Sequence, residues 1–394
     1  MNILMLSDVY FPRVNGVSTS IQTAARWLSE RGHAVTLVAP DYGQTDTEAF
    51  EILRVPAHGL FFDPEDRLMR GSALRAVYRG LVARSWDVIH VHTPFQAHRL
   101  GVRLARACGA PVVESYHTYF EQYVAHYLPW LPAGMLRAAS RSLSRWLCHQ
   151  VDHLVVPSDE MTRVLGGYGI RVPHTVLPTG IDLQRFAGGD GAAFRARHGI
   201  APQRPVVATV SRLAREKKID FLLEVVAKAR ETMPDLLLLV AGEGPDAPRL
   251  RELAAAPALA GAVRFFGYLD RDSDLLDCYR AADAFVFASP TETQGLVLIE
   301  ALALGVPVVS TAVMGTASVL RDAQGARIAP ESVSEFAQLV VTLLNDPSER
   351  ERLAQRARLD ARAWAVPTLM GRLEQLYRDL AATRVAPAAE IPAS

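Results

Sequence analysis

The sequence is short of several features that would define a protein class. It has only three cysteines, Cys108, Cys148 and Cys278, whose wide separation fits neither a disulfide framework nor a metal site. Such usage indicates a reducing compartment, so we expect a cytoplasmic protein. The opening residues MNILMLSDVY lack the basic segment of a signal peptide, and no run of about 18 uncharged apolar residues occurs. We therefore expect no membrane-spanning helix, and leave open a peripheral location on the inner face of the plasma membrane.

The chain also lacks an excess of either charge. Its 42 basic residues balance 42 acidic ones, so the overall charge does not indicate nucleic-acid binding. Lysine is scarce, because arginine supplies nearly all the basic residues and lysine occurs only at Lys217, Lys218 and Lys228. The adjacent pair at 217 and 218 therefore stands out as a candidate for a specific role.

The 394 residues exceed what a single core usually accommodates, and their pattern alternates apolar strands with amphipathic helices. The expected strands are 2–7, 33–40, 86–94, 110–118, 151–158, 205–212, 235–244, 262–269, 282–290 and 306–312. Such alternation predicts parallel sheets covered by helices on both faces.

We therefore predict an α/β protein of two doubly wound, Rossmann-like domains. The N-terminal domain covers 1–188 and the C-terminal domain 202–365, with the Gly- and Ala-rich stretch 185–203 as the linker. An amphipathic helix over 367–384 belongs to neither sheet by its period, and the tail after it is expected to be disordered. Ligands of such sheets bind at the carboxyl ends of the strands, so the site is expected in a cleft between the domains.

The stretch TETQGLVLIE, residues 291–300, combines a strand-end loop, a glycine and a helix start. Gly295 permits a close backbone approach, and the amides of Leu296 and Val297 open the helix, where phosphate binds well. Glu292 and Glu300 would repel phosphate but accept hydrogen bonds from hydroxyl groups on either side of a diphosphate. Taken alone, Glu292 is explained as a residue that begins a helix and is favoured by the helix dipole, and Glu300 as a solvated helix residue.

A second motif, VSRLAREKKID, begins at the end of the strand at 205–212. It brings Arg212 and Lys217 to a strand's carboxyl end, where both cations could neutralise a diphosphate. The alternative is a solvated basic loop. The turn AGEGP, containing Glu243 and Gly244, is a further strand-end glycine turn that suits a ligand lying across the second sheet.

Together these motifs resemble glycosyltransferase family 4, and the resemblance extends over nearly the whole chain. The family consists of retaining, nucleotide-sugar-dependent enzymes of the GT-B fold. The resemblance implies that Glu292 contacts the donor sugar, that Glu300 binds the ribose, and that Arg212 and Lys217 hold the diphosphate. It further implies that the base packs near Gly267, Tyr268 and Leu269.

The N-terminal half resembles the same family. YFPRVNGVSTS matches the family's first loop, in which Gly16 would contact donor or acceptor, while the role of Asn15 stays open. SYHTYFEQYVAHYLPWLP provides His117, which matches the active-site histidine and whose neutral imidazole could bond the donor sugar. Thr179 replaces an asparagine of the family pattern in LPTGIDLQRF. The helix 367–384 resembles the one that crosses back to the first domain.

We predict neither a metal nor a cofactor beyond the donor substrate. His90 and His92 are two strand histidines without further ligands, which are usually structural. DRDSD, residues 270–274, superficially resembles a metal-binding motif. The family generally needs no metal, because cations such as Arg212 and Lys217 stabilise the leaving diphosphate.

The acceptor is suggested by a segment without acidic residues, 123–150. Arg137, Arg141 and Arg145 recur every four positions there, accompanied by Leu136, Leu143, Trp146 and Leu147. This pattern suits a basic amphipathic helix over 133–149 lying on an anionic membrane, and suits equally a helix packed on the first domain with an arginine-rich outer face. The histidine motif also resembles bacterial transferases that glycosylate diacylglycerol.

The sequence thus predicts a retaining, metal-independent hexosyltransferase that uses a UDP-sugar, or a GDP-sugar, and a membrane lipid such as diacylglycerol. A soluble or polysaccharide acceptor is the first alternative. A nucleotide-sugar 2-epimerase and a non-catalytic nucleotide-sugar binder are alternatives of other classes. No G-x-G-x-x-G follows the first strand, which disfavours a dehydrogenase.

Overall fold

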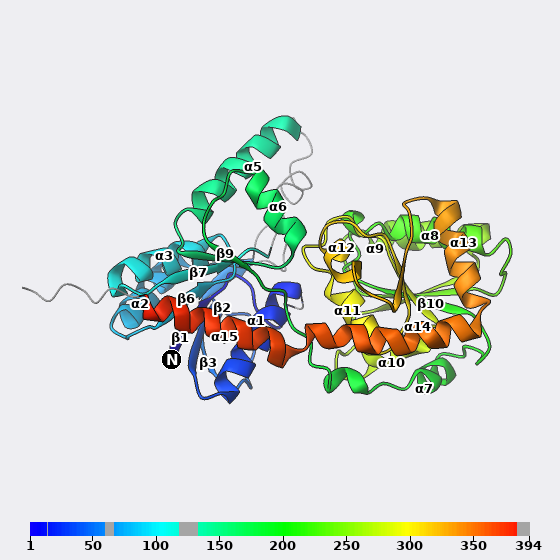
Figure 1. Cartoon of the computed structure of the whole chain (residues 1–394), viewed down its shortest axis with the longest axis horizontal. Helices are drawn as coiled ribbons and strands as arrows, with labels where there is room; N and C mark the ends of the chain where they lie inside the picture. The colour runs from blue at the N-terminus through cyan, green and yellow to red at the C-terminus, as the bar shows by residue number, and fades with distance from the viewer. Residues whose placement is uncertain (14, 60–66, 118–132, 384–394) are drawn as a thin grey trace, which may run out of the picture. The chain divides into compact units, whose positions relative to one another are not determined.

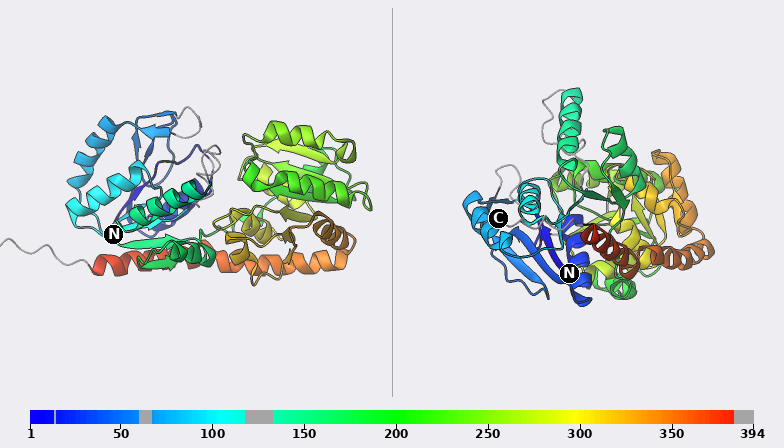
Figure 2. Two further views of the ribbon diagram at one scale, coloured as in Figure 1. Left: turned by 90° about the horizontal axis from the view of Figure 1, so that it is seen from above. Right: turned by 60° about the vertical axis from the view of Figure 1, so that its left-hand side comes forward.

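The computed structural model describes residues 1–13, 15–59, 67–117 and 133–383. The chain forms two compact units. The N-terminal unit combines Met1–Gly180 with the last segment, Val366–Ser394, and the C-terminal unit is Ile181–Ala365. In each unit, helices cover both faces of a parallel sheet (Figures 1 and 2). This is the predicted α/β class.

The described part of the N-terminal unit has a seven-stranded parallel sheet in the order β3-β2-β1-β6-β7-β8-β9. Its strands are β1 (Asn2–Leu6), β2 (Ala34–Pro40), β3 (Glu51–Val55), β6 (Val88–Val91), β7 (Val112–Ser115), β8 (His153–Val156) and β9 (His174–Val176), beside a hairpin of β4 (Ala57–Gly59) and β5 (Arg67–Met69). The strand order reverses between β1 and β6, and such a switch point is where ligands bind in doubly wound sheets.

The described helices of this unit are α1 (Gly16–Glu30), α2 (Gly71–Val82), α3 (Gln96–Cys108), α5 (Ala133–Cys148), α6 (Asp159–Gly167) and α15 (Val366–Ala382). Neighbouring residues of β6 point to opposite faces of the sheet. On one face, Gly101 of α3 lies so close that an added β-carbon would be 2.5 Å from the side chain of Val91. On the other, Tyr377 of α15 contacts His90. The C-terminal helix is therefore part of the N-terminal unit (Figure 1).

An ionic cluster fixes α15 to this unit. The carboxylate of Glu374 accepts hydrogen bonds from Arg31 Nε at 2.9 Å, from His33 Nε2 at 3.0 Å and from Arg378. Burial alone would raise the pKa of Glu374, but these three hydrogen bonds outweigh it and lower the pKa to about 2. The helix is thus attached through a carboxylate that stays ionised at neutral pH.

The C-terminal unit has a six-stranded parallel sheet in the order β12-β11-β10-β13-β14-β15. Its strands are β10 (Val206–Val210), β11 (Leu237–Ala241), β12 (Val263–Gly267), β13 (Ala284–Phe287), β14 (Val308–Ser310) and β15 (Ala326–Ile328). Its helices are α7 (Gly191–Arg197), α8 (Ile219–Ala229), α9 (Ala247–Ala254), α10 (Asp274–Ala281), α11 (Leu296–Ala303), α12 (Gly315–Leu320), α13 (Val333–Leu344) and α14 (Pro347–Asp360).

Each side of this second sheet has its own apolar core. Along β11, Leu237 and Leu239 belong to one buried cluster, whereas Leu238 and Val240 belong to the other. Such continuously apolar strands are typical of parallel sheets buried on both faces, which is why the sequence pattern identified these central strands.

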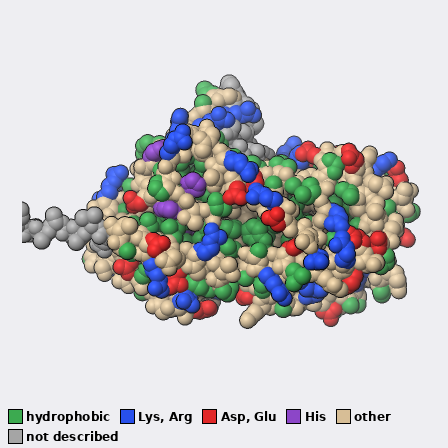
Figure 3. Space-filling model, viewed as in Figure 1, with side chains coloured by type: hydrophobic (Ala, Val, Ile, Leu, Met, Phe, Trp, Pro, Cys, Tyr) green, Lys and Arg blue, Asp and Glu red, His purple; other side chains and the backbone are tan. Residues whose placement is uncertain are grey.

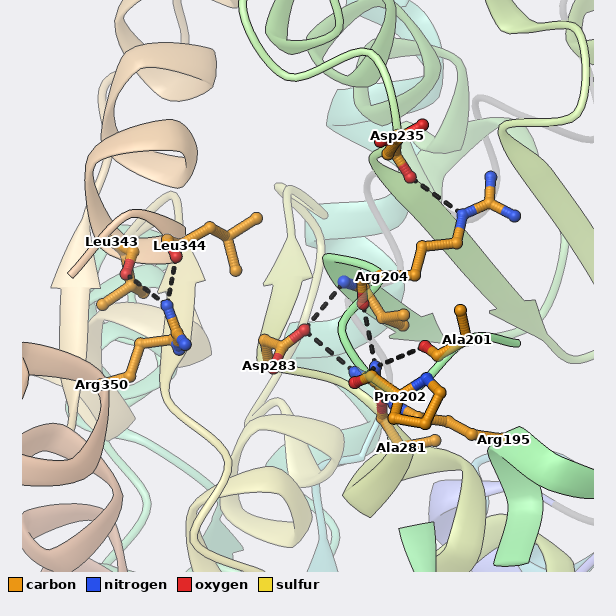
Figure 4. A network of polar contacts seen from close by, with 11 residues as sticks. Arg195, Ala201, Pro202, Arg204, Asp235, Ala281, Asp283, Leu343, Leu344 and Arg350 are labelled. Atoms are coloured by element: carbon orange, nitrogen blue, oxygen red, sulfur yellow. Dashed lines mark hydrogen bonds and ion pairs between the residues drawn. The ribbon is translucent and has the colours of Figure 1, made fainter. Parts of the chain in front are cut away.

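The predicted linker, 185–203, is instead part of the C-terminal unit, and that prediction was wrong. Phe194 of α7 is fully buried. The guanidinium of Arg195 donates to the carbonyl oxygens of Ala281 at 2.8 Å and Pro202 at 2.8 Å, and pairs with Asp283 at 3.0 Å (Figure 4). An added β-carbon on Gly191 would lie 2.2 Å from a backbone oxygen of α10. The glycines there permit close packing rather than flexibility.

Candidate active site

The two motifs singled out in the second half of the sequence meet at the carboxyl edge of the second sheet. Lys217 ends the short 3₁₀ turn Arg215–Lys217 before α8, and Glu292 lies in the loop between β13 and α11. Lys217 Nζ forms an ion pair with Glu292 Oε1, and the two side chains are 19% and 18% exposed. A lysine and a glutamate 75 residues apart thus form one charged contact at the edge where ligands bind.

Arg212 lies in the same region, immediately after β10. Its Nη2 is 3.5 Å from Glu216 Oε1, and its side chain is about one-third exposed. Because Arg212 and Lys217 lie on one loop, this edge carries two cations within a few residues. The structure therefore brings Arg212, Lys217 and Glu292 to the same strand ends, as the spacing predicted.

The glycine turn after β11 supports the loop that carries Arg212. Leu213 N donates to the carbonyl of Glu243 at 2.8 Å, and Asp246 N donates to the carbonyl of Leu213 at 2.9 Å. A β-carbon on Gly244 would lie 2.3 Å from that Leu213 carbonyl oxygen. Gly244 is thus required by backbone-to-backbone packing of two loops, and its role in approaching a ligand stays a prediction. The Glu243 carboxylate lies 3.5 Å from Arg251.

Helix α11 begins without a capping side chain. Gly295, its N-cap, has φ +89°, a left-handed conformation that favours glycine, and a β-carbon there would be 3.1 Å from the methyl of Thr316. The first turn, with Leu296 and Val297, carries no acidic residue. Gly315 N donates to the carbonyl of Glu292 at 2.8 Å, which fixes the backbone of that glutamate.

Glu300 is a buried carboxylate rather than a solvated helix residue. One oxygen accepts a hydrogen bond from Arg271 Nη2 at 2.7 Å, and the other accepts from the hydroxyl of Tyr279 at 2.9 Å. The charge of Glu300 raises the pKa of Arg271. Neither partner was predicted from the sequence, and Arg271 lies within the DRDSD segment, which was interpreted only as a resemblance to a metal-binding motif.

The residues predicted near the base lie at the end of β12. Gly267 has φ +67°, and a β-carbon on it would be 2.9 Å from a carboxylate oxygen of Glu243. Tyr268 is 57% exposed, whereas Leu269 packs against the apolar core. An exposed aromatic ring beside a glycine offers a surface on which a planar base can stack.

In the N-terminal unit, His117 follows β7 and lies beside two further histidines. Its Nε2 is 3.2 Å from His92 Nδ1, while His90 contacts Ser115 Oγ at 2.8 Å and the hydroxyl of Tyr377. Burial lowers the pKa of His117 to about 4 and that of His90 to about 3, and it lowers the pKa of His92 well below its usual value. All three imidazoles are neutral at pH 7, as was expected for His117.

The first loop contributes a helix cap and a carboxylate. The side chain of Asn15 accepts a hydrogen bond from Ser18 N at 2.8 Å and so caps α1, which begins at Gly16. Asp8, which the sequence did not single out, accepts from the amides of Gln96 at 3.1 Å and Ala97 at 3.2 Å at the start of α3. Burial raises the pKa of Asp8 to about 6.

The DRDSD carboxylates are bonded to protein groups. Asp270 Oδ1 accepts from Ser273 Oγ at 2.7 Å, Asp272 pairs with Arg185 at 2.8 Å, and Asp274 pairs with Arg197 at 3.1 Å. Within the described ranges, no three of His, Cys, Asp and Glu gather as a metal site would require. The donor set therefore gives no support to a metal at this motif.

Known protein families match both halves of the chain. The family described as glycosyl transferases group 1 matches residues 190–360, and glycosyltransferase family 4 matches residues 14–185. An alpha-monoglucosyldiacylglycerol synthase of Streptococcus pneumoniae is 35% identical over 79% of this chain and 71% of its own length. The chain belongs to glycosyltransferase family 4.

Other relatives differ in what their names say they make. A glycogen synthase of Mycobacterium tuberculosis is 30% identical over 91% of this chain and 89% of its own length. The solved structure of Anabaena HepE in complex with UDP has 17% identity and a TM-score of 0.78, and the match covers 96% of this chain and all of that one. The glycosyltransferase therefore has the GT-B fold of two Rossmann-like units, as predicted.

Helix α5 of this glycosyltransferase has three different sides. Leu136 and Leu147 are buried in the unit, as the alternative of a helix packed on the first domain requires. Met135, Leu143 and Trp146 are 54%, 43% and 54% exposed. The third side faces a groove that α5 shares with α6, lined by Gly134, Arg137, Ala138, Arg141, Ser142, Arg145, Gly167 and Tyr168.

Basic side chains lie over the face of α5 that Figure 3 shows. The helix stands out from the body of its unit in two views (Figures 1 and 2), and blue side chains without red ones lie over it in the space-filling view (Figure 3). Arg141 also stacks over the ring of Tyr168, with the guanidinium carbon 5.4 Å from the ring centroid. The remainder of the predicted histidine motif, 118–132, and the tail after 383 lie outside the described residues. In the described part of the chain, no helix is long and apolar enough to cross a bilayer.

Proposed function

We propose that this glycosyltransferase transfers a hexosyl group from a UDP-sugar to a membrane lipid such as diacylglycerol, with retention of configuration and without a metal. The contact between Lys217 and Glu292 beside the start of α11 is the observation that carries the donor assignment. It supplies a cation for the diphosphate and a carboxylate for sugar hydroxyls, next to helix amides that suit phosphate.

The donor would be bound in three parts. Arg212, Lys217 and the amides of Leu296 and Val297 hold the diphosphate. Glu300 accepts from the ribose hydroxyls, and its carboxylate is oriented by Arg271 and Tyr279. The base packs by Gly267, Tyr268 and Leu269, with the turn of Glu243 and Gly244 behind it. We propose UDP rather than GDP as the nucleotide, and a solved structure of the same fold contains UDP.

The chemistry would rely on electrostatic stabilisation. As the bond from sugar to diphosphate breaks, negative charge grows on the leaving phosphate, and Arg212 and Lys217 stabilise it without a divalent ion. The family resemblance favours attack by the acceptor hydroxyl from the face that the phosphate leaves, with the leaving phosphate taking the proton of that hydroxyl. Neutral His117 bonds a hydroxyl of the donor sugar, and Gly16 contacts the donor or acceptor.

The lipid acceptor is supported by α5. Its exposed Met135, Leu143 and Trp146 would enter the interface, and Arg137, Arg141 and Arg145 would face anionic headgroups. The printed name of the pneumococcal relative indicates the same kind of acceptor. We accordingly propose a cytoplasmic protein attached peripherally to the membrane. A polysaccharide acceptor is the second candidate, because the name of the mycobacterial relative indicates one.

A direct assay separates these candidates. The full chain would be incubated with UDP-glucose, UDP-galactose, UDP-N-acetylglucosamine or GDP-mannose, each with diacylglycerol vesicles, with glycogen, or without an acceptor, and the products would be analysed by mass spectrometry. We expect a hexosyl lipid from one UDP-sugar, with an α-linkage by NMR and no loss of activity in a metal chelator. An elongated glycogen would move the assignment to the second candidate. An epimerised sugar without acceptor, or binding without turnover, would contradict the proposal.

A further inference from the structure

His92 lies at the centre of a stack of three imidazoles in the N-terminal unit. Its ring centroid is 4.0 Å from that of His90 and 5.5 Å from that of His117, and its plane is within 15° of the His117 plane. His92 directly follows β6, the strand that contains His90, and only 3% of the surface of His92 is exposed. The contact between His92 Nδ1 and His117 Nε2, at 3.2 Å, joins two ring nitrogens.

The His90 ring forms a fixed base for this stack. Both of its nitrogens have partners, since Nδ1 meets the hydroxyl of Tyr377 and Nε2 lies 2.8 Å from Ser115 Oγ. Tyr377 is itself fully buried on α15. The orientation of the His90 ring is therefore set by two hydrogen bonds, and the His92 ring is held between it and His117.

The contact between His92 and His117 requires one ring to donate and the other to accept. A neutral imidazole carries one N–H and one lone pair, so the proton positions of the two rings are coupled. If His117 Nε2–H donated, His92 would carry its own proton on Nε2, an atom that is buried and has no partner in the described part of the chain. If His92 Nδ1–H donates, that buried Nε2 presents only a lone pair.

We propose that His92 is a positioning residue, which donates its Nδ1–H to His117 Nε2 and so holds His117 in the Nδ1–H tautomer. Buried N–H groups without an acceptor are rarer than under-satisfied acceptors, which favours this direction of the bond. A cavity of about 30 Å³, lined by the three histidines and Thr179 among others, adjoins the stack and has room for about one water that could donate to His92 Nε2.

For the enzyme, the consequence is that His117 has one defined hydrogen-bond donor. With Nε2 of His117 occupied as an acceptor, Nδ1–H is the group through which this ring would donate to an oxygen of the sugar. This consequence, unlike the tautomer itself, rests on the proposed function. A phenylalanine at position 92 would fill the same stack without burying a polar nitrogen, so the imidazole is explained by its hydrogen bond rather than by packing alone.

The tautomer can be measured without any assay of activity. The full chain would be labelled with ¹⁵N-histidine, and long-range ¹H–¹⁵N correlation spectra would distinguish protonated from unprotonated ring nitrogens at pH 7, with His117 assigned by its loss in His117→Gln. We expect His117 to be protonated on Nδ1 in the wild type. In His92→Phe we expect it to change to the Nε2–H form that free histidine prefers. A wild-type His117 protonated on Nε2, or a spectrum of His117 unchanged in His92→Phe, would overturn the proposal.

Control variants show whether a change at His117 comes from the loss of its hydrogen bond with His92 or from a change in the fold. His153→Phe removes a histidine from β8 whose Nε2 meets Thr175 Oγ1 at 2.8 Å, and it should leave the His117 signals unchanged. If His92→Phe does not fold, the wild-type tautomer and His92→Asn, which keeps an N–H donor near the Nδ1 position, still decide the question. In His92→Asn we expect His117 to stay in the Nδ1–H form.

Kinetics then test the link to the reaction. We expect His92→Phe to lower kcat about tenfold or more with little change in the KM for the nucleotide sugar, and His92→Asn to restore most of it. An equal loss in both variants, with the His117 tautomer unchanged, would attribute the effect to packing and overturn the proposal. If no transfer activity exists in the wild type, the proposed function fails, while the spectra still decide the role of His92.

Discussion

At the carboxyl ends of the strands, the C-terminal unit carries paired charges, whereas the N-terminal unit carries neutral imidazoles. Lys217 and Glu292 form an ion pair in the first case. Burial keeps His90, His92 and His117 uncharged in the second. The two sheets have the same parallel architecture, so the fold does not dictate this difference. It is set by which side chains end the strands and by how deeply they are buried.

The difference suits two parts of a nucleotide sugar, its central diphosphate and its terminal hexose. A diphosphate is best recognised by cations and helix amides, which the C-terminal unit provides. A hexose is uncharged, and neutral donors and acceptors can bond its hydroxyls without an unpaired charge being buried. In the N-terminal unit, Glu374 attaches α15 at the amino end of β2, while Asp8, just past the carboxyl end of β1, is a carboxylate that holds the start of α3 and whose pKa burial raises to about 6. Four experiments test this contrast between the two units.

The largest effect is expected from removing the lysine of the charged site. Lys217→Ala should lower the rate of transfer by about 10²- to 10³-fold, because the leaving diphosphate loses a cation that stabilises it. Turnover would be measured with the donor and acceptor found by the product assay, and folding by circular dichroism. Lys228→Ala, which removes a lysine paired with Glu231 on the surface, is the matched control. Wild-type turnover in folded Lys217→Ala would refute the charged half of the comparison.

Much of this charged site could be predicted because it is built from short, continuous segments of the sequence. A strand end, a loop and a helix start are visible in the sequence, and parallel strands bring such loops to one edge. The pairing of Arg271 with Glu300 was missed, because it joins a loop to a residue 29 positions later whose direction depends on the turn of α11. His92 was interpreted as structural, since no pattern in the sequence shows that its ring lies against His117.

The strands likewise divide into those that the sequence pattern identified and those that it did not. Central strands such as β10 and β11 are long and apolar, so their pattern identified them. The edge strands β9 and β15 have three residues each and are partly exposed, which left too little pattern to recognise. In 185–203 the glycines indicated flexibility, whereas Gly191 is there because α10 leaves no room for a β-carbon. Composition alone cannot separate these two uses of glycine.

A second experiment concerns how the N-terminal unit meets its acceptor. Replacing Arg137, Arg141 and Arg145 together with Ala should weaken binding to anionic vesicles about 100-fold, at about 1 kcal/mol for each arginine near the surface. Co-sedimentation with vesicles rich in phosphatidylglycerol would measure it. The control is a triple variant in which Arg75, Arg79 and Arg103, exposed on α2 and α3, are replaced with Ala. It changes the net charge of the protein by the same amount. Equal losses in both triple variants would show that net charge, and not α5, attaches the protein.

A third experiment tests whether the ion pair competes with the ligand. Glu292→Gln should tighten the binding of UDP by about two- to fivefold, because Lys217 no longer has a carboxylate to leave before it contacts the diphosphate. Isothermal titration with UDP would measure this, even though transfer is expected to fall. Glu331→Gln, which frees the neighbouring Lys218, is the control and should change the affinity less. Weaker binding in Glu292→Gln would mean that Glu292 positions Lys217 for the ligand instead of competing with it.

The smallest effect is expected where the N-terminal unit uses charge for its own stability. The pKa of Glu374 is about 2 in the folded protein, below its usual value of 4.5, so the unfolded chain binds a proton more readily than the folded one. Its contribution to stability is therefore fully present above about pH 4.5 and is lost as the pH falls towards 2. Glu374→Gln should cost about 1 kcal/mol at pH 7, because Arg31 and Arg378 are more than half exposed and water screens them. Urea unfolding of both proteins between pH 7 and pH 3 should show this difference shrinking with acidity, and a difference that grows instead would mean that Glu374 acts by its shape rather than by its charge.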